Sequence, residues 1–383
     1  MKLARYIGGG EIAIVDEPAP ICPSGGLLVR TLASGLCSGE LMDWYMEKKV
    51  PHVLGHEVCG VILESEDARF PVGNRVFAHH HSPCLACDFC KKGLYVHCAQ
   101  WKRTKLDPGG MAEMFAVSPE NLNDSFLVDD LRPIDAALVE PLGCVVKSIE
   151  RSGIPLIPRH APWREVQPGG ESRTPPGVAG HRVSGVAGHD VSVAGERGIP
   201  ELPLPSGGEA GESEFHEDEP GEGVSAAVIG LGSLGLMHLL LLPGAAGYDL
   251  NPERIRHARS LGLDARPLDG REKADTIFVC PGSKPALDLA IDLANPGGTI
   301  VLFAPLPPTG EIPVDLNRLY FNDIRLVTTY SCGPEDTGIA ASILRSGQVK
   351  AEMVVSDFIG ISELPEAYQQ MKRGEILKPM VVF

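Results

Sequence analysis

The stretch Val224-Ser-Ala-Ala-Val-Ile-Gly230-Leu-Gly232-Ser233-Leu234-Gly235-Leu-Met-His-Leu239 decides the fold of the second half of this chain. A strand-like run enters Gly-x-Gly-x-x-Gly and leaves it as an apolar helix, an order typical of dinucleotide-binding units. Gly230 permits the tight turn, Gly232 lets the backbone approach a pyrophosphate, and Gly235 allows close packing of the helix on the strand. Ser233 and Leu234 open the helix, whose N-terminus faces the phosphates in such units, so we expect all five residues to contact the cofactor. A purely structural glycine turn is the alternative interpretation.

An acidic residue, Asp249, follows in Gly247-Tyr-Asp249-Leu-Asn-Pro-Glu253. A carboxylate at the end of the second strand can hydrogen-bond both ribose hydroxyls and repels a 2′-phosphate, so the sequence favours NAD over NADP. Asp249 lies only 14 residues after Gly235, and Pro243-Gly244 ends the first helix early. We therefore expect a very short second strand at 245–248 and a compressed nucleotide-binding half.

Strand-like and helix-like segments alternate beyond Asp249, with short connections. This alternation predicts a parallel, doubly wound sheet over residues 224–330. The expected strands are 274–280, 298–304 and 324–330, and the expected helices are 285–294 and 316–322.

Residues 1–150 are predicted to form a separate, β-rich domain, because short apolar or β-branched runs alternate there with Gly and Pro. A helix is expected at 133–149, interrupted at Glu140-Pro141, since Pro141 lacks a backbone donor. Residues 331–383 are expected to return to this domain through a last strand at 378–383. The remaining expected elements are strands at 11–15, 27–31, 58–63, 75–78 and 111–117 and helices at 337–346 and 364–373.

Residues 151–223 differ from the rest of the chain and are interpreted as a low-complexity insertion. They hold two near-copies of an octet, 177–184 and 185–192, and an acidic run that contains no Lys or Arg. Few large apolar side chains are available there, so we expect disorder. His181 and His189 are eight residues apart, but chance placement explains them better than a metal site.

The charge balance of the chain excludes some partners. It has 34 Lys and Arg against 50 Asp and Glu, a formal net charge of −16, which argues against nucleic acid and against an anionic membrane face. The first residues lack the order of a signal peptide, and no apolar run approaches the length of a membrane span. A cytoplasmic protein that binds small molecules is therefore expected.

Four cysteines, Cys84, Cys87, Cys90 and Cys98, have the spacing of a tetrahedral zinc site. Four thiolates leave no open position on zinc, so we expect a structural site. Free thiols or two strained disulfides are the alternative. Ten cysteines without a secretory signal favour metal binding over a disulfide framework.

Three weaker signals supply the residue types of a second metal site: Cys37, the pair His56-Glu57, and Glu140 beside Pro141. Each also has a purely structural interpretation. Cys37 can be a buried thiol, His56-Glu57 a hydrogen-bonded pair, and Glu140 a solvated helix residue. The residues by themselves do not decide between these interpretations.

Taken together, these motifs resemble the zinc-dependent medium-chain alcohol dehydrogenases, and most closely their sorbitol and threonine dehydrogenase branch. The resemblance rests on Cys37, Gly55-His56-Glu57, Gly73-Asn-Arg75-Val76, the four cysteines, Gly109-Gly110-Met-Ala-Glu113, Glu140-Pro141 and the glycine pattern, and it covers the chain except 151–223. It implies a GroES-like catalytic domain, a Rossmann-fold domain inserted into it, and a dimer or tetramer.

By this resemblance Cys37, His56 and Glu57 are expected to bind a catalytic zinc, with Glu140 as a further or alternating ligand. The expected cofactors are two zinc ions per chain and NAD, and the expected substrate is a secondary alcohol or polyol. The family's usual Ser or Thr two residues after the ligand Cys is Gly39 here, so we expect the proton to leave through Ser38, Glu57 or water. Because of the insertion and the short second strand, a catalytically weak zinc protein that binds a ligand or partner is the alternative.

Overall fold

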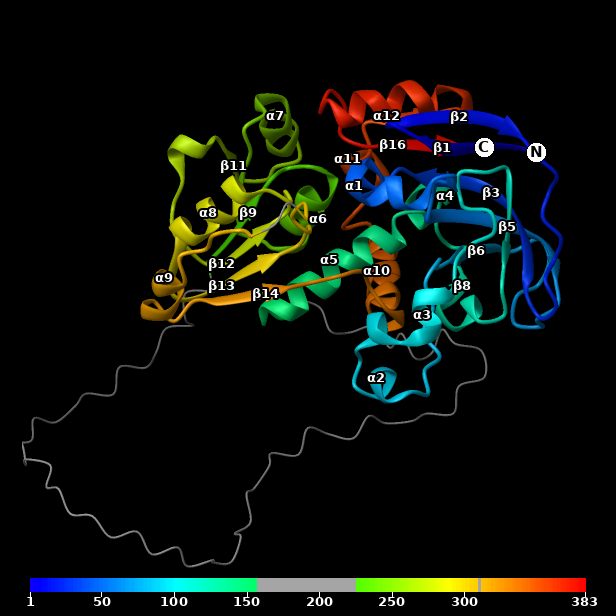
Figure 1. Cartoon of the computed structure of the whole chain (residues 1–383), viewed down its shortest axis with the longest axis horizontal. Coiled ribbons are helices and arrows are strands. Elements are labelled where there is room, and N and C mark those ends of the chain that lie inside the picture. Colours follow the sequence, from blue (N-terminus) through cyan, green and yellow to red (C-terminus); the bar gives the residue numbers. More distant parts are fainter. Residues whose placement is uncertain (157–224, 309–310) are drawn as a thin grey trace, which may run out of the picture. The chain divides into compact units, whose positions relative to one another are not determined.

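The computed structural model describes residues 1–156, 225–308 and 311–383. The predicted insertion at 151–223, with His181 and His189, falls almost entirely outside the described residues. Figure 1 shows a β-rich part, which contains both ends of the chain, and a part built on a six-stranded sheet. The predicted class, an α/β protein with a β-rich domain and a doubly wound parallel sheet, is confirmed.

The β-rich part is organised around β3 (Leu27–Gly35), which pairs antiparallel with β5 (Glu57–Ser65), β7 (Met114–Val117) and the C-terminal strand β16 (Pro379–Val382). Alternating side chains of β3, β5 and β7 form one buried core. Its sheet has the order β15-β16-β3-β5-β6-β8, and a second sheet has the order β2-β1-β4. The remaining strands are β1 (Lys2–Gly8), β2 (Glu11–Asp16), β4 (His52–Val53), β6 (Arg75–Ala78), β8 (Ser125–Leu127) and β15 (Asp357–Ile359).

The six-stranded sheet of the other part is fully parallel, with the strand order β11-β10-β9-β12-β13-β14. Its central strands are almost entirely buried, as expected for a sheet covered by helices on both faces (Figure 1). The strands are β9 (Ala226–Ile229), β10 (Ala246–Tyr248), β11 (Ala265–Arg266), β12 (Ala274–Val279), β13 (Ala294–Leu302) and β14 (Arg325–Thr328), and the helices are α6 (Ser233–Leu241), α7 (Pro252–Ser260), α8 (Lys284–Leu293) and α9 (Leu316–Phe321).

The compressed nucleotide-binding half is present as expected. Helix α6 ends at Leu241, just before Pro243-Gly244, and β10 is only three residues long. Helix α7 was not predicted from the sequence, because it has few apolar residues and only Ile255 and Ala258 are buried. Asn251 caps this helix by accepting the Glu253 N–H at 2.8 Å, a signal that the sequence did contain.

The predicted interruption at Glu140-Pro141 is wrong by a few residues. The chain forms α4 (Pro133–Ala136) and then α5 (Val139–Ser152), so the break lies at 137–138. Pro141 occupies the first turn of α5, where a backbone N–H has no partner within the helix and its loss costs little. Glu140 therefore stands at the buried N-terminal end of a continuous helix.

Helix α5 also joins the largest core. It packs against α6 and against α10 (Pro334–Ser346), and apolar side chains of the three helices form one cluster. The other C-terminal helices are α11 (Ala351–Val354) and α12 (Leu364–Lys372). No helix among the described residues has the length and apolar character needed to cross a membrane.

His238, on α6, is completely buried against α5. Its Nδ1 lies 2.8 Å from the Leu234 carbonyl oxygen, to which it donates, and its Nε2 accepts from the Ser148 hydroxyl at 3.0 Å. Burial lowers the pKa of His238 to about 4, against an ordinary value of 6.5. As the pH falls, His238 is therefore protonated at a higher pH in the unfolded chain than in the folded protein. The stabilisation that this difference gives to the fold is fully present above pH 6.5.

This stabilisation is lost as the pH falls from 6.5 towards 4. Over that interval we expect wild-type protein to lose about 3 kcal/mol more unfolding free energy than His238→Gln, since one pKa unit corresponds to about 1.4 kcal/mol. Urea unfolding at a series of pH values measures the difference. His257→Gln, at a half-buried histidine of α7, is the control. Equal losses in wild type and His238→Gln contradict the assignment.

Candidate active site

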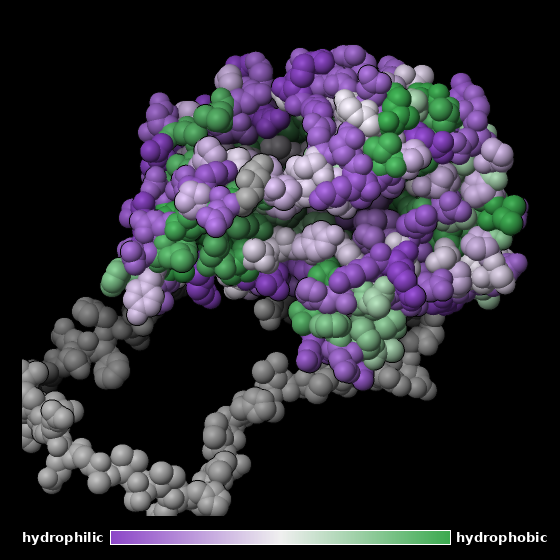
Figure 2. Space-filling model, viewed as in Figure 1, coloured by the Kyte–Doolittle hydropathy of each residue, from purple (hydrophilic) through white to green (hydrophobic). Residues whose placement is uncertain are grey.

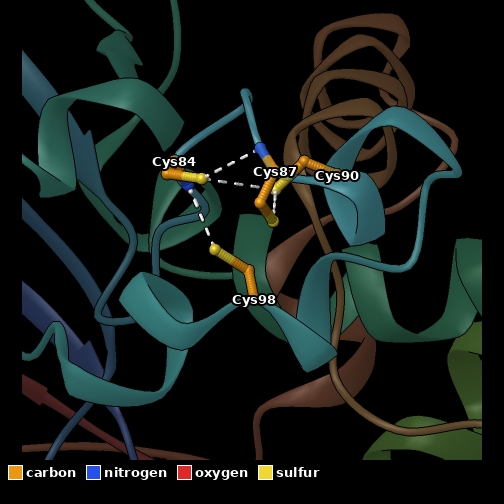
Figure 3. Close-up of side chains that lie close together, drawn as sticks. All are labelled: Cys84, Cys87, Cys90 and Cys98. Carbon is orange, nitrogen blue, oxygen red and sulfur yellow. Dashed lines mark hydrogen bonds between the residues drawn. The ribbon is translucent and has the colours of Figure 1, made fainter.

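The four cysteines of the predicted structural site converge in one small lobe, residues 84–98 (Figure 3). Their sulfur atoms all lie within 4.8 Å of one another, with Cys87 and Cys90 at 3.5 Å and Cys84 and Cys90 at 3.9 Å. Backbone N–H groups point at two of the sulfurs, from Cys84 to Cys98 Sγ and from Cys87 to Cys84 Sγ, both at 3.4 Å. Converging sulfurs that accept backbone N–H groups suit thiolates bound to zinc, so the residues fit this metal.

A second group consists of Cys37, His56 and Glu57, whose ligand atoms also lie within 4.8 Å of one another. Cys37 caps a short 3-10 helix, Ser38–Leu41, and its sulfur accepts the Gly39 N–H at 3.3 Å. His56 precedes β5 and Glu57 opens it, so the sheet holds both. A thiolate, an imidazole and a carboxylate are the donors of a catalytic zinc site with room for a further ligand.

Glu40 orients His56. Its carboxylate is buried, lies 3.4 Å from His56 Nδ1, and accepts the Gly55 N–H at 2.8 Å. Nδ1 is thereby engaged, which leaves Nε2 for a metal, as in many zinc sites. Although burial disfavours a charged ring, Cys37 and Glu40 raise the pKa of His56 well above its ordinary value.

Lys378 is a component of the site that sequence reasoning missed. Its ammonium group forms an ion pair with Glu57, both side chains are almost fully buried, and it also donates to the Leu36 carbonyl at 2.9 Å. Burial raises the pKa of Glu57, and Lys378 opposes the rise. The pairing of β16 with β3 brings Lys378 to Glu57, a contact that no local pattern reveals.

The two other predicted site residues, Glu140 and Ser38, lie outside the Cys37 group. Glu140 does not join the Cys37 group in one tight cluster; its carboxylate groups instead with His79 and His80, and with Cys144 and Cys332. Ser38 is exposed, and among the described residues its side chain has no hydrogen-bond partner.

The glycine turn has the shape that a dinucleotide requires. Gly230 adopts φ +88°, and a Cβ on Gly235 would lie 1.9 Å from the Gly230 carbonyl oxygen, so neither position accepts a side chain. Nothing lies within 4 Å of a Cβ built on Gly232, which leaves open space at the start of α6, where Ser233 and Leu234 follow. This open, glycine-lined helix N-terminus fits a pyrophosphate.

Asp249 lies beside the same turn and is mostly buried. Its two oxygens accept the N–H groups of Leu231 at 2.6 Å and Asn251 at 2.7 Å, and Arg254 Nη1 lies 3.8 Å away. Each carboxylate oxygen keeps a second acceptor site, so the residue can still receive ribose hydroxyls. The turn and Asp249 together fit an NAD half-site.

Several known dehydrogenases and reductases are similar to this chain along most of its length. A family model described as the alcohol dehydrogenase GroES-like domain matches residues 23–124. D-altritol 5-dehydrogenase of Agrobacterium fabrum is 26% identical, over 95% of this chain and 94% of its own length. Sorbitol dehydrogenase of Bacillus subtilis is 24% identical, over 100% and 97%. The solved structure of acetophenone reductase from Geotrichum candidum in complex with NAD has a TM-score of 0.71 at 18% identity, over 100% of this chain and 97% of that one, and shares the fold.

Proposed function

This chain belongs to the zinc-dependent medium-chain dehydrogenases, and we propose that it transfers a hydride from a secondary alcohol or polyol to NAD⁺. The observation that carries the proposal is the convergence of Cys37, His56 and Glu57 within 4.8 Å in a chain that also presents an open glycine turn beside Asp249. The similarity to D-altritol and sorbitol dehydrogenases supports a polyol as substrate. No comparison supports the alternative of a catalytically weak binding protein.

In this mechanism Cys37, His56 and Glu57 hold the catalytic zinc, which when bound supplies a Lewis acid that lowers the pKa of a substrate hydroxyl. Glu40 keeps His56 in the orientation and tautomer that present Nε2. Lys378 compensates the negative charge of buried Glu57, so that the site does not accumulate unbalanced carboxylate charge. Ser38, exposed next to Cys37, offers a route for the substrate proton to solvent, with Glu57 and water as alternatives.

The parallel sheet supplies the other half of the reaction. Gly230, Gly232 and Gly235, with Ser233 and Leu234, receive the pyrophosphate, and Asp249 receives the adenosine ribose. NAD⁺ when bound supplies the hydride acceptor, and the fold determines its position relative to the substrate.

A substrate screen tests the proposal. Purified protein with measured zinc content is assayed for NADH formation with hexitols, pentitols, threonine and simple secondary alcohols. We expect turnover with at least one polyol and saturation with NAD⁺. Zinc-replete protein that binds NAD⁺ but oxidises none of these alcohols contradicts the substrate class, and zinc-replete protein without NAD⁺ affinity contradicts the function.

Asp249→Ser is expected to shift the cofactor preference towards NADP⁺. The change removes the carboxylate that repels a 2′-phosphate and leaves Arg254, 3.8 Å from it, free to attract one. We expect kcat/KM for NAD⁺ to fall by about ten- to a hundredfold, since a hydrogen bond to a charged group contributes about 1.5–3 kcal/mol, and we expect kcat/KM for NADP⁺ to rise. Asp264→Ser, in an exposed ion pair with Arg266, is the control. Unchanged preference contradicts the role of Asp249.

We also propose that the protein is a cytoplasmic homo-oligomer. Strand β14 is an open edge of the sheet, and Leu326 on it is exposed together with Leu316, Tyr320 and Phe321. Figure 2 shows apolar side chains gathered on the visible surface of the part that carries this sheet. Such an edge is suited to pairing with a second copy. None of the ten cysteines forms a disulfide, and cysteines without disulfides are usual in a reducing compartment. Analytical ultracentrifugation tests the association state.

A further inference from the structure

His79 is a fully buried histidine to which the proposed reaction assigns no role. It follows β6, and its Nδ1 lies 2.7 Å from Asp124 Oδ2. A carboxylate only accepts, so Nδ1 carries the proton and Nε2 keeps its lone pair. Thr337 donates to the other oxygen of Asp124 at 2.7 Å, which holds the carboxylate in place. A histidine bonded to a carboxylate through one nitrogen and open at the other is the usual arrangement of a metal ligand.

The Nε2 of His79 faces Cys332 and Glu140, and Cys144 lies on the other side of these two residues' cluster, within reach of both. Cys332 Sγ lies 3.7 Å from Nε2, and Cys144 Sγ lies 3.5 Å from a carboxylate oxygen of Glu140. The ligand atoms of Glu140, Cys144 and Cys332 lie within 4.8 Å of one another, and those of His79 and Glu140 also lie within 4.8 Å. Glu140 and Cys144 stand one turn apart on α5, so they share a face of that helix. Cys332 comes from the segment before α10 and is fully buried.

We propose that His79, Glu140, Cys144 and Cys332 form an additional metal site, distinct from the Cys37 group and the four-cysteine lobe. Two thiolates, an imidazole and a carboxylate form a tetrahedral donor set that suits zinc. Binding releases the two thiol protons to solvent, since the metal takes thiolates. Packing of two small apolar residues would explain the buried thiols, but it does not explain an oriented imidazole and a carboxylate that converge on them.

Metal counting tests the site without reference to activity. Full-length protein is reduced, loaded with Zn²⁺ or with Co²⁺, desalted and analysed for bound metal, and Co²⁺ samples are also examined for thiolate-to-cobalt charge-transfer absorption. Wild type is expected to bind one ion per chain more than the double variant Cys144→Ser/Cys332→Ser, with a matching loss of absorption in the variant. Cys22→Ser, at a cysteine outside the cluster whose thiol lies near the Pro23 and Gly26 carbonyls, is expected to bind as wild type does.

Two further variants keep the outcome clear. Cys144→Ser alone, at the less buried thiol, replaces the double variant if the latter fails to fold. In a His56→Ala background, where the Cys37 group is impaired, the one-ion difference must persist. Equal metal content in folded wild type and folded thiol variants overturns the proposal, whatever the activity of either protein.

Discussion

His56→Ala is expected to reduce kcat by roughly a thousandfold or more, because the metal's contribution to the reaction amounts to several kcal/mol and each factor of ten corresponds to about 1.4 kcal/mol. The substitution removes the ring that Glu40 orients and leaves Cys37 and Glu57 as an incomplete donor set. Steady-state kinetics with the substrate found in the screen measures the loss, and metal analysis should show one zinc fewer per chain.

The fold should tolerate this change. His56 lies immediately before β5 with a side chain that is 21% exposed, and it is not part of the apolar core of this sheet. We expect an unchanged circular dichroism spectrum and a melting temperature close to that of wild type. His52→Ala, at a half-buried histidine of β4, is the matched control and should retain most of its activity. A His56→Ala protein that is folded, zinc-depleted and fully active contradicts the assignment of the catalytic group.

Cys90→Ser is expected to act on stability instead of chemistry. Cys90 is only 6% exposed, and its sulfur lies 3.5 Å from the sulfur of Cys87 and 3.9 Å from the sulfur of Cys84. Its loss leaves three thiolates and forfeits several kcal/mol of zinc-binding free energy, which corresponds to a fall in Tm of about 10 °C for a chain of this size. Differential scanning calorimetry with metal analysis measures both effects.

The damage should spread beyond the lobe. Trp101, which follows it, packs edge-on against Tyr330 with ring centroids 5.7 Å apart, and Tyr95 lies directly against Gly333. The lobe therefore supports the segment that carries Cys332. Phe89→Ser, at a half-exposed residue beside Cys90, is the control and should leave both zinc content and Tm nearly unchanged. A Cys90→Ser protein with full zinc content and unchanged Tm contradicts a structural metal in the lobe.

The sequence predicted most elements because their signals are local. The turn at Gly230, the alternation beyond Asp249 and the spacing of the four cysteines each lie within a short stretch, where backbone geometry and ligand spacing dictate the outcome. Helix α7 escaped prediction because it has few apolar residues and only two of them are buried. The break before α5 was misplaced because a proline in a first turn does not interrupt a helix.

Some residues of the candidate site could be found from local sequence, and others only from the tertiary structure. The sequence by itself offered Cys37, His56 and Glu57 as candidate donors, since these residues flank predicted strands in turn-like stretches, and the family resemblance joined them into one expected site. Only the tertiary structure decided that Lys378 faces Glu57 and that Glu140 faces His79, Cys144 and Cys332. The physical reason is that these partners meet through strand pairing and helix packing between distant segments, and such contacts leave no periodicity or spacing in the chain.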